Sequence, residues 1–179
     1  MASDTRQETD SRDDFRQTLI ATLPHLRAFA RGLCGRPDLA DDLVQETAIK
    51  AWAAQVRFQP GTNMRAWTFT ILRNHYLSEL RRHRRQVDYD PEAAERLLVM
   101  DADQEGPLHL SDMDAALQKL PAERREALLL IGASGFTYEE AARICDCAIG
   151  TMKSRVARAR AELARLLDPE PEDASLPHI

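Results

Sequence analysis

The chain has 179 residues, the length of one ordinary domain or of two small ones, which excludes a large multidomain enzyme. Apolar residues make up 44% of it, enough for a packed core, whereas only 7 Gly and 9 Pro argue against a collagen-like or turn-dense all-β chain. The net charge is −5, but residues 15–86 carry +7 and residues 115–167 carry +3, whereas residues 87–114 carry −8. Two cationic blocks are therefore separated by an acidic segment, and the net charge says nothing against nucleic-acid binding.

The two ends of the chain and its longest apolar run indicate a cytoplasmic protein without membrane contact. Residues 1–14 contain acids and no apolar signal-peptide core, so we expect a disordered acidic N-terminus there. Residues 168–179 carry −4, and we expect them to form a disordered acidic tail. The longest apolar run, residues 127–133, is far shorter than the ~20 residues that a membrane span needs.

The three cysteines do not form a disulfide framework, and we interpret them as small buried residues. Cys145 and Cys147 are too close together to close a useful loop, and no second Cys or His pair lies at zinc spacing. The five His are scattered and no Gly-rich phosphate loop is present. The sequence therefore predicts no metal, no cofactor and no enzymatic activity.

Apolar positions recur every three or four residues through most of the chain, and no strand-like alternation persists. We therefore predict an all-α fold. A first helical stretch runs from Phe15 to Leu33, either continuing through Pro24 or restarting there, and Gly35 is placed to end it. Pro37 suits the first turn of the next helix.

A polar loop and a long cationic helix complete the first block. Residues 58–63 (FQPGTN) are expected to form the loop, because Pro and Gly break the helical period and Asn63 can cap the helix that follows. That helix runs from Met64 to about Arg85. It combines cations with aromatics: Arg73, His75, Arg81, Arg82, Arg84 and Arg85 with Trp67, Phe69 and Tyr76. Cations interleaved with aromatics suit single-stranded or opened DNA, although aromatics at this spacing are more often simply core.

The second block follows an acidic stretch. Residues 87–110 have the composition of a flexible, solvated linker. Beyond it we predict helices over residues 111–120 and 121–134. The expected organisation is two small helical domains, residues 15–86 and 111–167, joined by this acidic linker.

The second block ends in a predicted helix-turn-helix. Residues 137–140 (TYEE) form a capping-box pattern that opens a short helix. A turn at residues 146–148 leads into a last helix over about 149–167. Two short helices joined by a tight turn, the second rich in Arg, are typical of a DNA-binding helix-turn-helix.

The last predicted helix has an apolar side and a polar side. Small residues on the polar side allow close approach to the major groove, polar residues reach base edges, and flanking cations hold phosphates. A solvated amphipathic helix is the alternative interpretation of the same pattern. The candidate DNA contacts are Lys153, Ser154, Arg155, Ala157, Arg158 and Arg160.

Four separated motifs together resemble those of an extracytoplasmic-function (ECF) sigma factor of the sigma-70 family. They are DLADDLVQET at residues 38–47, RAW at 65–67 with Asn74 downstream, TYEEAA at 137–142 and GTMKSRVARAR at 150–160. The stretch LIGASGF at residues 130–136 resembles the EcfG-type subgroup of the alphaproteobacterial general stress response.

The resemblance implies a promoter-specificity subunit of RNA polymerase with a division of labour among its residues. It implies that sigma domain 4 meets the minus-35 element through the six candidate contacts of the last helix. It implies that a base flipped from the minus-10 element enters a pocket at the loop, because capturing a flipped base turns its unstacking cost into promoter choice. The implied minus-10 residues are Phe58, Gly61, Thr62, Asn63, Trp67, Phe69, Arg73, Asn74, Arg81 and Arg82.

The resemblance also implies partners. Core polymerase would be bound through the β′ clamp helices and the β flap, with Asp41, Asp42, Gln45 and Glu46 on the clamp helices. The alternative for the three acids among them is stabilisation of the helix N-terminus by negative charge. The other implied partners are promoter DNA and a NepR-like anti-sigma factor. We expect the acidic linker to let the two domains open on polymerase or close with the inhibitor.

Two other functions fit parts of the sequence. A sigma-like decoy that sequesters an anti-sigma factor would not need the DNA-binding cations, yet this chain retains both Arg clusters. An ordinary helix-turn-helix repressor would not explain the cationic, aromatic first block or the acidic linker.

Overall fold

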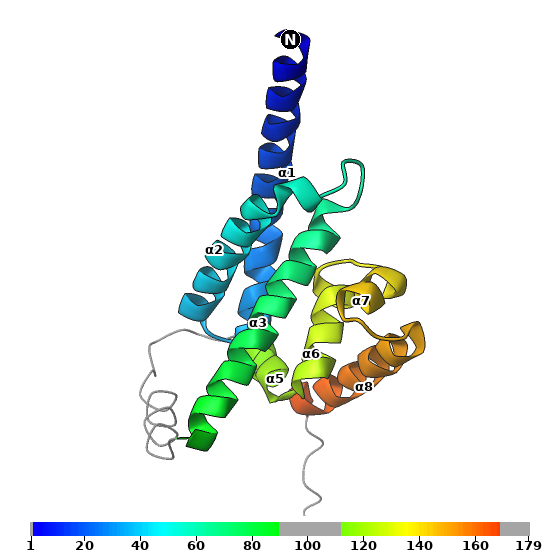
Figure 1. Ribbon diagram of the computed structural model, residues 1–179. Helices are drawn as coiled ribbons and strands as arrows, with labels where there is room; N and C mark the ends of the chain where they lie inside the picture. The colour runs from blue at the N-terminus through cyan, green and yellow to red at the C-terminus, as the bar shows by residue number, and fades with distance from the viewer. Residues whose placement is uncertain (1, 90–111, 169–179) are drawn as a thin grey trace, which may run out of the picture.

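The computed structural model describes residues 2–89 and 112–168, and every regular element in these ranges is helical (Figure 1). The predicted all-α fold is confirmed. Most of the predicted linker, residues 90–111, and the tail from residue 169 lie outside the described ranges. The first half contains α1 (Ala2–Cys34), α2 (Pro37–Ala53), the 3-10 turn η1 (Gln55–Arg57) and α3 (Met64–Tyr89). The second half contains α5 (Asp112–Lys119), α6 (Ala122–Leu128), the π-helical turn η2 (Leu129–Ala133), α7 (Tyr138–Ile144) and α8 (Ile149–Leu167).

Helix α1 is longer than the sequence predicts. It begins at Ala2, so the expected disordered N-terminus over residues 1–14 is helical from its second residue onward. Residues 2–14 contain no Gly or Pro, and extending a helix whose later turns are packed costs far less than nucleating one. Pro24 does not interrupt α1. Its position faces solvent, so the backbone carbonyl that loses its helical hydrogen bond there is not buried without a partner. Gly35, at φ 70°, ends the helix as predicted.

Three helices of the first half pack side by side (Figure 1). Leu26, Phe29 and Leu33 of α1 are buried against Leu43 of α2 and Leu72 of α3, so the apolar stripes of the three helices meet in one core. The predicted loop at residues 58–63 follows η1. Its last residue caps α3, because the Asn63 side-chain oxygen accepts a hydrogen bond from the Ala66 amide at 3.1 Å.

The second half contains the predicted helix-turn-helix. Thr137 and Glu140 form the expected capping box at the start of α7, with hydrogen bonds of 3.2 Å and 3.0 Å. Asp146 adopts a left-handed conformation at φ 50° and turns the chain toward α8. Met152 and Val156 hold α8 in the core. The predicted single helix over residues 121–134 is α6 continued by a π-helical turn, in which the Ser134 amide bonds to the Leu129 carbonyl.

The two halves share a continuous hydrophobic core, a closeness that the sequence does not predict. Phe69 of α3 contacts Phe29 of α1 and Phe136 of the second half, with ring centroids 4.9 Å apart in both pairs. The halves approach each other closely at Gly32 of α1, where an added Cβ would lie 2.7 Å from a methyl group of Leu129. A larger residue at position 32 would therefore require the Leu129 side chain to move.

Within the two described ranges, no helix is long and apolar enough to cross a membrane.

Candidate nucleic-acid interface

Helix α8 presents a cationic face to solvent. Its buried side is formed by Met152, Val156 and Ala159, which the helical period places opposite Ala157 and Arg158. The exposed candidate contacts are Lys153, Ala157, Arg158 and Arg160. The small Ala157 leaves room beside the longer side chains, so a flat groove wall can approach this face closely.

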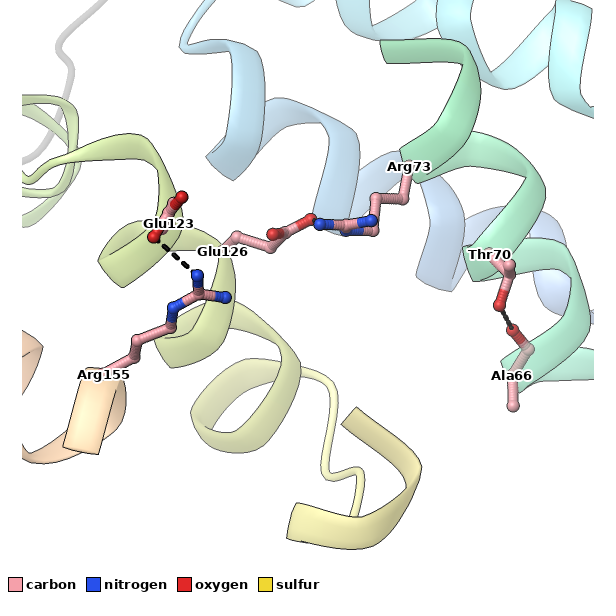
Figure 2. A network of polar contacts seen from close by, with 6 residues as sticks. All are labelled: Ala66, Thr70, Arg73, Glu123, Glu126 and Arg155. Atoms are coloured by element: carbon pink, nitrogen blue, oxygen red, sulfur yellow. Dashed lines mark hydrogen bonds and ion pairs between the residues drawn. The ribbon is translucent and has the colours of Figure 1, made fainter. Parts of the chain in front are cut away.

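The other two candidates on α8 are held by polar contacts within the protein. Arg155 is half-buried and its Nη2 lies 2.6 Å from Oε2 of Glu123 on α6, as Figure 2 shows. The Ser154 hydroxyl donates to the Thr151 carbonyl at 2.9 Å. Arg155 therefore ties α8 to α6, and its guanidinium is less available to DNA than that of Arg158.

Two of the predicted minus-10 residues lie in an aromatic cluster. Phe58 and Trp67 have ring centroids 5.3 Å apart, and Phe15 of α1 lies 5.6 Å from Phe58 and 6.2 Å from Trp67. Beside this cluster is a cavity of about 480 Å³ that includes Phe58, Gly61 and Thr62 in its lining. The structure therefore brings the predicted loop together with part of α1. Sequence reasoning missed that part because it assigned the residues before Phe15 to a disordered segment.

Three other predicted minus-10 residues are engaged by the second half of the chain. Phe69 is fully buried. Arg73 Nε lies 2.7 Å from Oε1 of Glu126 on α6, and these side chains are only 14% and 7% exposed (Figure 2). The Asn63 side-chain amide donates to Glu140 of α7 at 2.9 Å. In this arrangement none of the three is free to meet a DNA strand.

The electrostatics of the domain contact favour the charged form of Arg73. Burial alone would lower the pKa of Arg73, but the neighbouring Glu126 carboxylate and Cys145 outweigh that effect and raise the pKa overall. Arg65 adds a second cationic contact. Its guanidinium lies 5.6 Å from the Phe69 ring centroid and 5.1 Å from that of Phe136, and it donates to the Ser134 carbonyl at 2.5 Å. Sequence reasoning did not assign Arg65 a role.

The remaining minus-10 candidates lie on the surface of α3. Asn74, Arg81 and Arg82 are exposed, and Arg82 pairs with Glu79 one turn earlier at 2.8 Å. We call the packing of the two halves against each other the closed arrangement. In it these side chains are exposed to solvent and remain accessible to a DNA strand that runs along α3.

The acidic candidates on α2 share one solvent-exposed face: Asp41, Asp42, Gln45 and Glu46. Asp41 pairs with Arg27 of α1 at 3.0 Å, so this carboxylate is partly neutralised. The apolar Leu39 and Ile49 on the same helix are 45% and 53% exposed. A polar face flanked by exposed apolar side chains is the composition expected of a surface that docks a partner helix.

Cys145 is buried in the core, and Cys34 and Cys147 are partly buried against it. Burial raises the pKa of Cys34 to about 11 and that of Cys145 to about 12, so both remain thiols near neutral pH and are poor nucleophiles. In the described ranges, no group of three or more His, Cys, Asp or Glu side chains could hold a metal ion.

This arrangement, a helical bundle with an aromatic pocket followed by a helix-turn-helix, is matched by two regions of the sigma-70 family. Sigma-70 region 2 matches residues 19–86, and sigma-70 region 4 matches residues 110–163. The chain is 51% identical over 155 residues to the ECF RNA polymerase sigma factor EcfG of Rhodopseudomonas palustris, covering 87% of this chain and 86% of that protein.

Two solved structures are similar as well. The sigma factor RpoE in complex with the anti-sigma factor NepR from Bartonella quintana has a TM-score of 0.74 and 48% identity, covering 88% of this chain and 99% of that one. CnrH in complex with the cytosolic domain of CnrY has a TM-score of 0.63 and 30% identity, covering 88% of this chain and 89% of that one.

The chain therefore belongs to the ECF RNA polymerase sigma factors of the sigma-70 family. It directs RNA polymerase to promoters and is not itself an enzyme, as the sequence predicts. The similarity to a sigma factor over most of both chains favours this function over the decoy and the repressor.

Proposed function

We propose that three surfaces of this sigma factor perform separate tasks. The exposed face of α8 reads the minus-35 duplex, the loop before α3 together with α3 captures the melted minus-10 strand, and the acidic face of α2 binds the β′ clamp helices. The observation that carries this assignment is the amphipathic placement of α8, whose apolar side is buried and whose cations are exposed. The domains that hold these surfaces correspond to residues 15–86 and 111–167.

The minus-35 surface divides its residues between two kinds of contact. Arg158 and Lys153 are exposed and long enough to reach base edges or phosphates, whereas Arg155 is held by Glu123. We infer that Arg158 contributes most to base recognition, because a planar guanidinium can donate two hydrogen bonds to guanine. The small Ala157 lets the DNA groove approach α8 closely, and the exposed Arg160 contacts a phosphate.

The minus-10 surface is only partly available in the closed arrangement. Within the described residues, the second half makes no hydrogen bond or ion pair with Phe58, Gly61, Thr62 or Trp67, whereas it contacts Asn63, Phe69 and Arg73. Full engagement of the minus-10 strand therefore requires the two halves to separate. We infer that binding to polymerase and promoter supplies the free energy for this opening.

We infer that the regulator of this sigma factor is a NepR-like anti-sigma factor, and that the regulated response is a stress response. The support is the 48% identity to a sigma factor that was solved in complex with NepR. The β flap is the second polymerase contact that we propose, for the domain of residues 111–167. Because these partners act in the cytoplasm, we place this protein there too.

Transcription in vitro with purified core RNA polymerase tests the α2 assignment. Asp42→Lys reverses an exposed charge on the proposed docking face and should weaken core binding on the order of tenfold. Asp13→Lys is the matched control, since Asp13 is an exposed acid on α1 and lies outside the proposed face of α2. Equal binding of both variants to core polymerase would refute this docking surface.

A further inference from the structure

The cavity beside the predicted loop is built from three elements, and one of them is α1. Its volume is about 480 Å³. The loop side and η1 contribute Gln55, Val56, Phe58, Pro60, Gly61 and Thr62, and Met64 opens α3. Helix α1 contributes Arg12, Asp14, Phe15 and Thr18. No residue of 112–168 lines it, so the cavity does not depend on opening of the two halves.

One side of the cavity is apolar and aromatic. Phe15 is 8% exposed and packs edge-on against Phe58, and Met64, which is 5% exposed, belongs to the same apolar cluster. Val56 is 88% exposed at the rim, although burial of an apolar side chain is favourable. Aromatic surfaces with an apolar rim suit an unstacked nucleic-acid base, since every base has a flat π-face that can be covered.

The α1 side of the cavity carries an acid and a base with no assigned partner. Among the residues whose side chains are described, none forms an ion pair or hydrogen bond with the Arg12 guanidinium or the Asp14 carboxylate. Their neighbours differ, because Asp13 pairs with Arg16 at 3.4 Å. The Thr18 hydroxyl donates to the backbone carbonyl of Asp14 at 2.8 Å and does not contact the Asp14 carboxylate.

Stabilisation of the helix N-terminus does not account for an acid at position 14. A negative charge stabilises a helix within its first turn, and α1 begins at Ala2, three turns before Asp14. Asp14 is exposed and lines a cavity whose other walls are apolar or carry neutral polar groups, except for Arg12. A carboxylate in that position can only accept hydrogen bonds, and a guanidinium can only donate them.

We infer that α1 is part of the minus-10 site and that Asp14 selects the captured base. This inference rests on the proposed capture of a minus-10 base at the loop. The Asp14 carboxylate accepts a hydrogen bond from the exocyclic amino group of adenine, cytosine or guanine, a group that thymine lacks. Arg12 binds the phosphate next to that base, a contact that carries no sequence information. Asp14 is therefore a specificity-determining residue and Arg12 a phosphate contact.

The experiment measures the affinity of the holoenzyme, assembled from core RNA polymerase and the full chain, for premelted promoter templates. Each position of the minus-10 strand carries each of the four bases in turn. Asp14→Asn should reduce the preference for amino-bearing bases over thymine at one position by on the order of tenfold. Asp13→Asn, which removes only an exposed ion pair, should keep the wild-type preference.

Arg12 is tested on the same templates with Arg16 as its matched control. Arg12→Ala should weaken binding to all templates equally and reduce the slope of log affinity against log salt by about one. Arg16→Ala, which lies outside the cavity lining, should leave that slope unchanged. Far-ultraviolet circular dichroism of the free variants checks that α1 remains helical.

The outcomes separate the two proposals. If the wild-type holoenzyme shows no base preference at any single minus-10 position, the proposed base capture at the loop is wrong. If the wild type shows such a preference and Asp14→Asn retains it, base capture stands and the role of α1 is overturned. A change in anti-sigma affinity with unchanged template preference would also overturn it, because the cavity would then bind protein.

Discussion

The two cationic regions of this sigma factor look alike in sequence but differ in structure. In α8 the apolar side is buried and Arg158 and Lys153 face solvent. In α3, Arg73 is buried in an ion pair with Glu126, and Arg65 packs against two aromatic rings of the domain contact. A run of cations therefore shows which helix is charged, but its function depends on what the rest of the chain places opposite each charge.

The difference has an electrostatic cause. An arginine in water has little to gain from one exposed carboxylate, whereas a desolvated arginine must be paired. Helix α8 lies at the edge of the molecule (Figure 1), and α3 has a neighbour on the side that carries Arg65 and Arg73. The contact between the two halves therefore occupies Arg73 of the minus-10 candidates, whereas Arg158 and Arg160 of the minus-35 candidates stay exposed.

Removing the Glu126 charge should have the largest effect on this contrast. Glu126→Gln leaves the Arg73 guanidinium buried without a counter-charge, at a cost of roughly 3–5 kcal/mol that separation of the halves can relieve. We expect a larger radius of gyration in small-angle scattering of the free protein and tighter binding to a premelted minus-10 strand.

Two variants control for this effect. Glu162→Gln breaks the ion pair between Glu162 and Arg124. These side chains are 33% and 35% exposed, so the radius of gyration and the strand affinity should change little. The double variant Arg73→Met and Glu126→Met removes both charges and should restore the compact form. If Glu126→Gln scatters like the wild type, the ion pair does not hold the two halves together.

Arg158→Ala tests the exposed cationic face of α8. Loss of a base contact should cost roughly 1–3 kcal/mol on the preferred minus-35 sequence and much less on a sequence changed at the contacted base pair. Arg155→Ala should show a smaller dependence on sequence, because Glu123 holds that guanidinium. Fluorescence anisotropy of the holoenzyme on a set of minus-35 duplexes measures both. A uniform loss over all duplexes would make Arg158 a phosphate contact instead.

Thr137→Ala should have a smaller effect, confined to the second half. It removes the capping-box hydrogen bond to the Glu140 amide and should lower the free energy of unfolding by about 1 kcal/mol. Thr137→Ser keeps the hydroxyl and is the matched control. Urea unfolding midpoints give the difference, and equal midpoints for the Ala and Ser variants would show that the cap does not contribute.

The smallest expected effect is a pH dependence at the same cap. The Thr137 backbone amide donates to the Glu140 carboxylate and lowers the pKa of Glu140, with a further contribution from Asn63. The folded state therefore favours the ionised carboxylate. This stability is fully present above the ordinary pKa of about 4.5 and is lost as the pH falls through the lowered pKa of the folded state.

The Glu140→Gln variant measures that contribution. The difference in unfolding free energy between wild type and variant should be larger at neutral pH than at acidic pH, where the wild-type carboxyl is protonated too. A difference that does not change with pH would show that the ionised carboxylate contributes nothing.

Much of the secondary structure could be predicted because its signals are local. The capping box at Thr137, the helix end at Gly35 and the start at Pro37 each involve groups within a few residues of one another. The period of the apolar residues likewise identifies the buried side of α8. The N-terminal extension of α1 was predicted wrongly, because its polar composition resembles that of a disordered segment.

The sequence by itself determined the all-α class, the helix-turn-helix and the family, since these depend on periodicity, capping and motifs that lie close together along the chain. Only the tertiary structure decided which cations are free, because Arg73 and Glu126 are 53 residues apart. It also decided that α1 completes the cavity beside Phe58. Contacts between distant segments depend on how the helices pack, and the pattern within one helix carries no information about the side chains that the others bring to it.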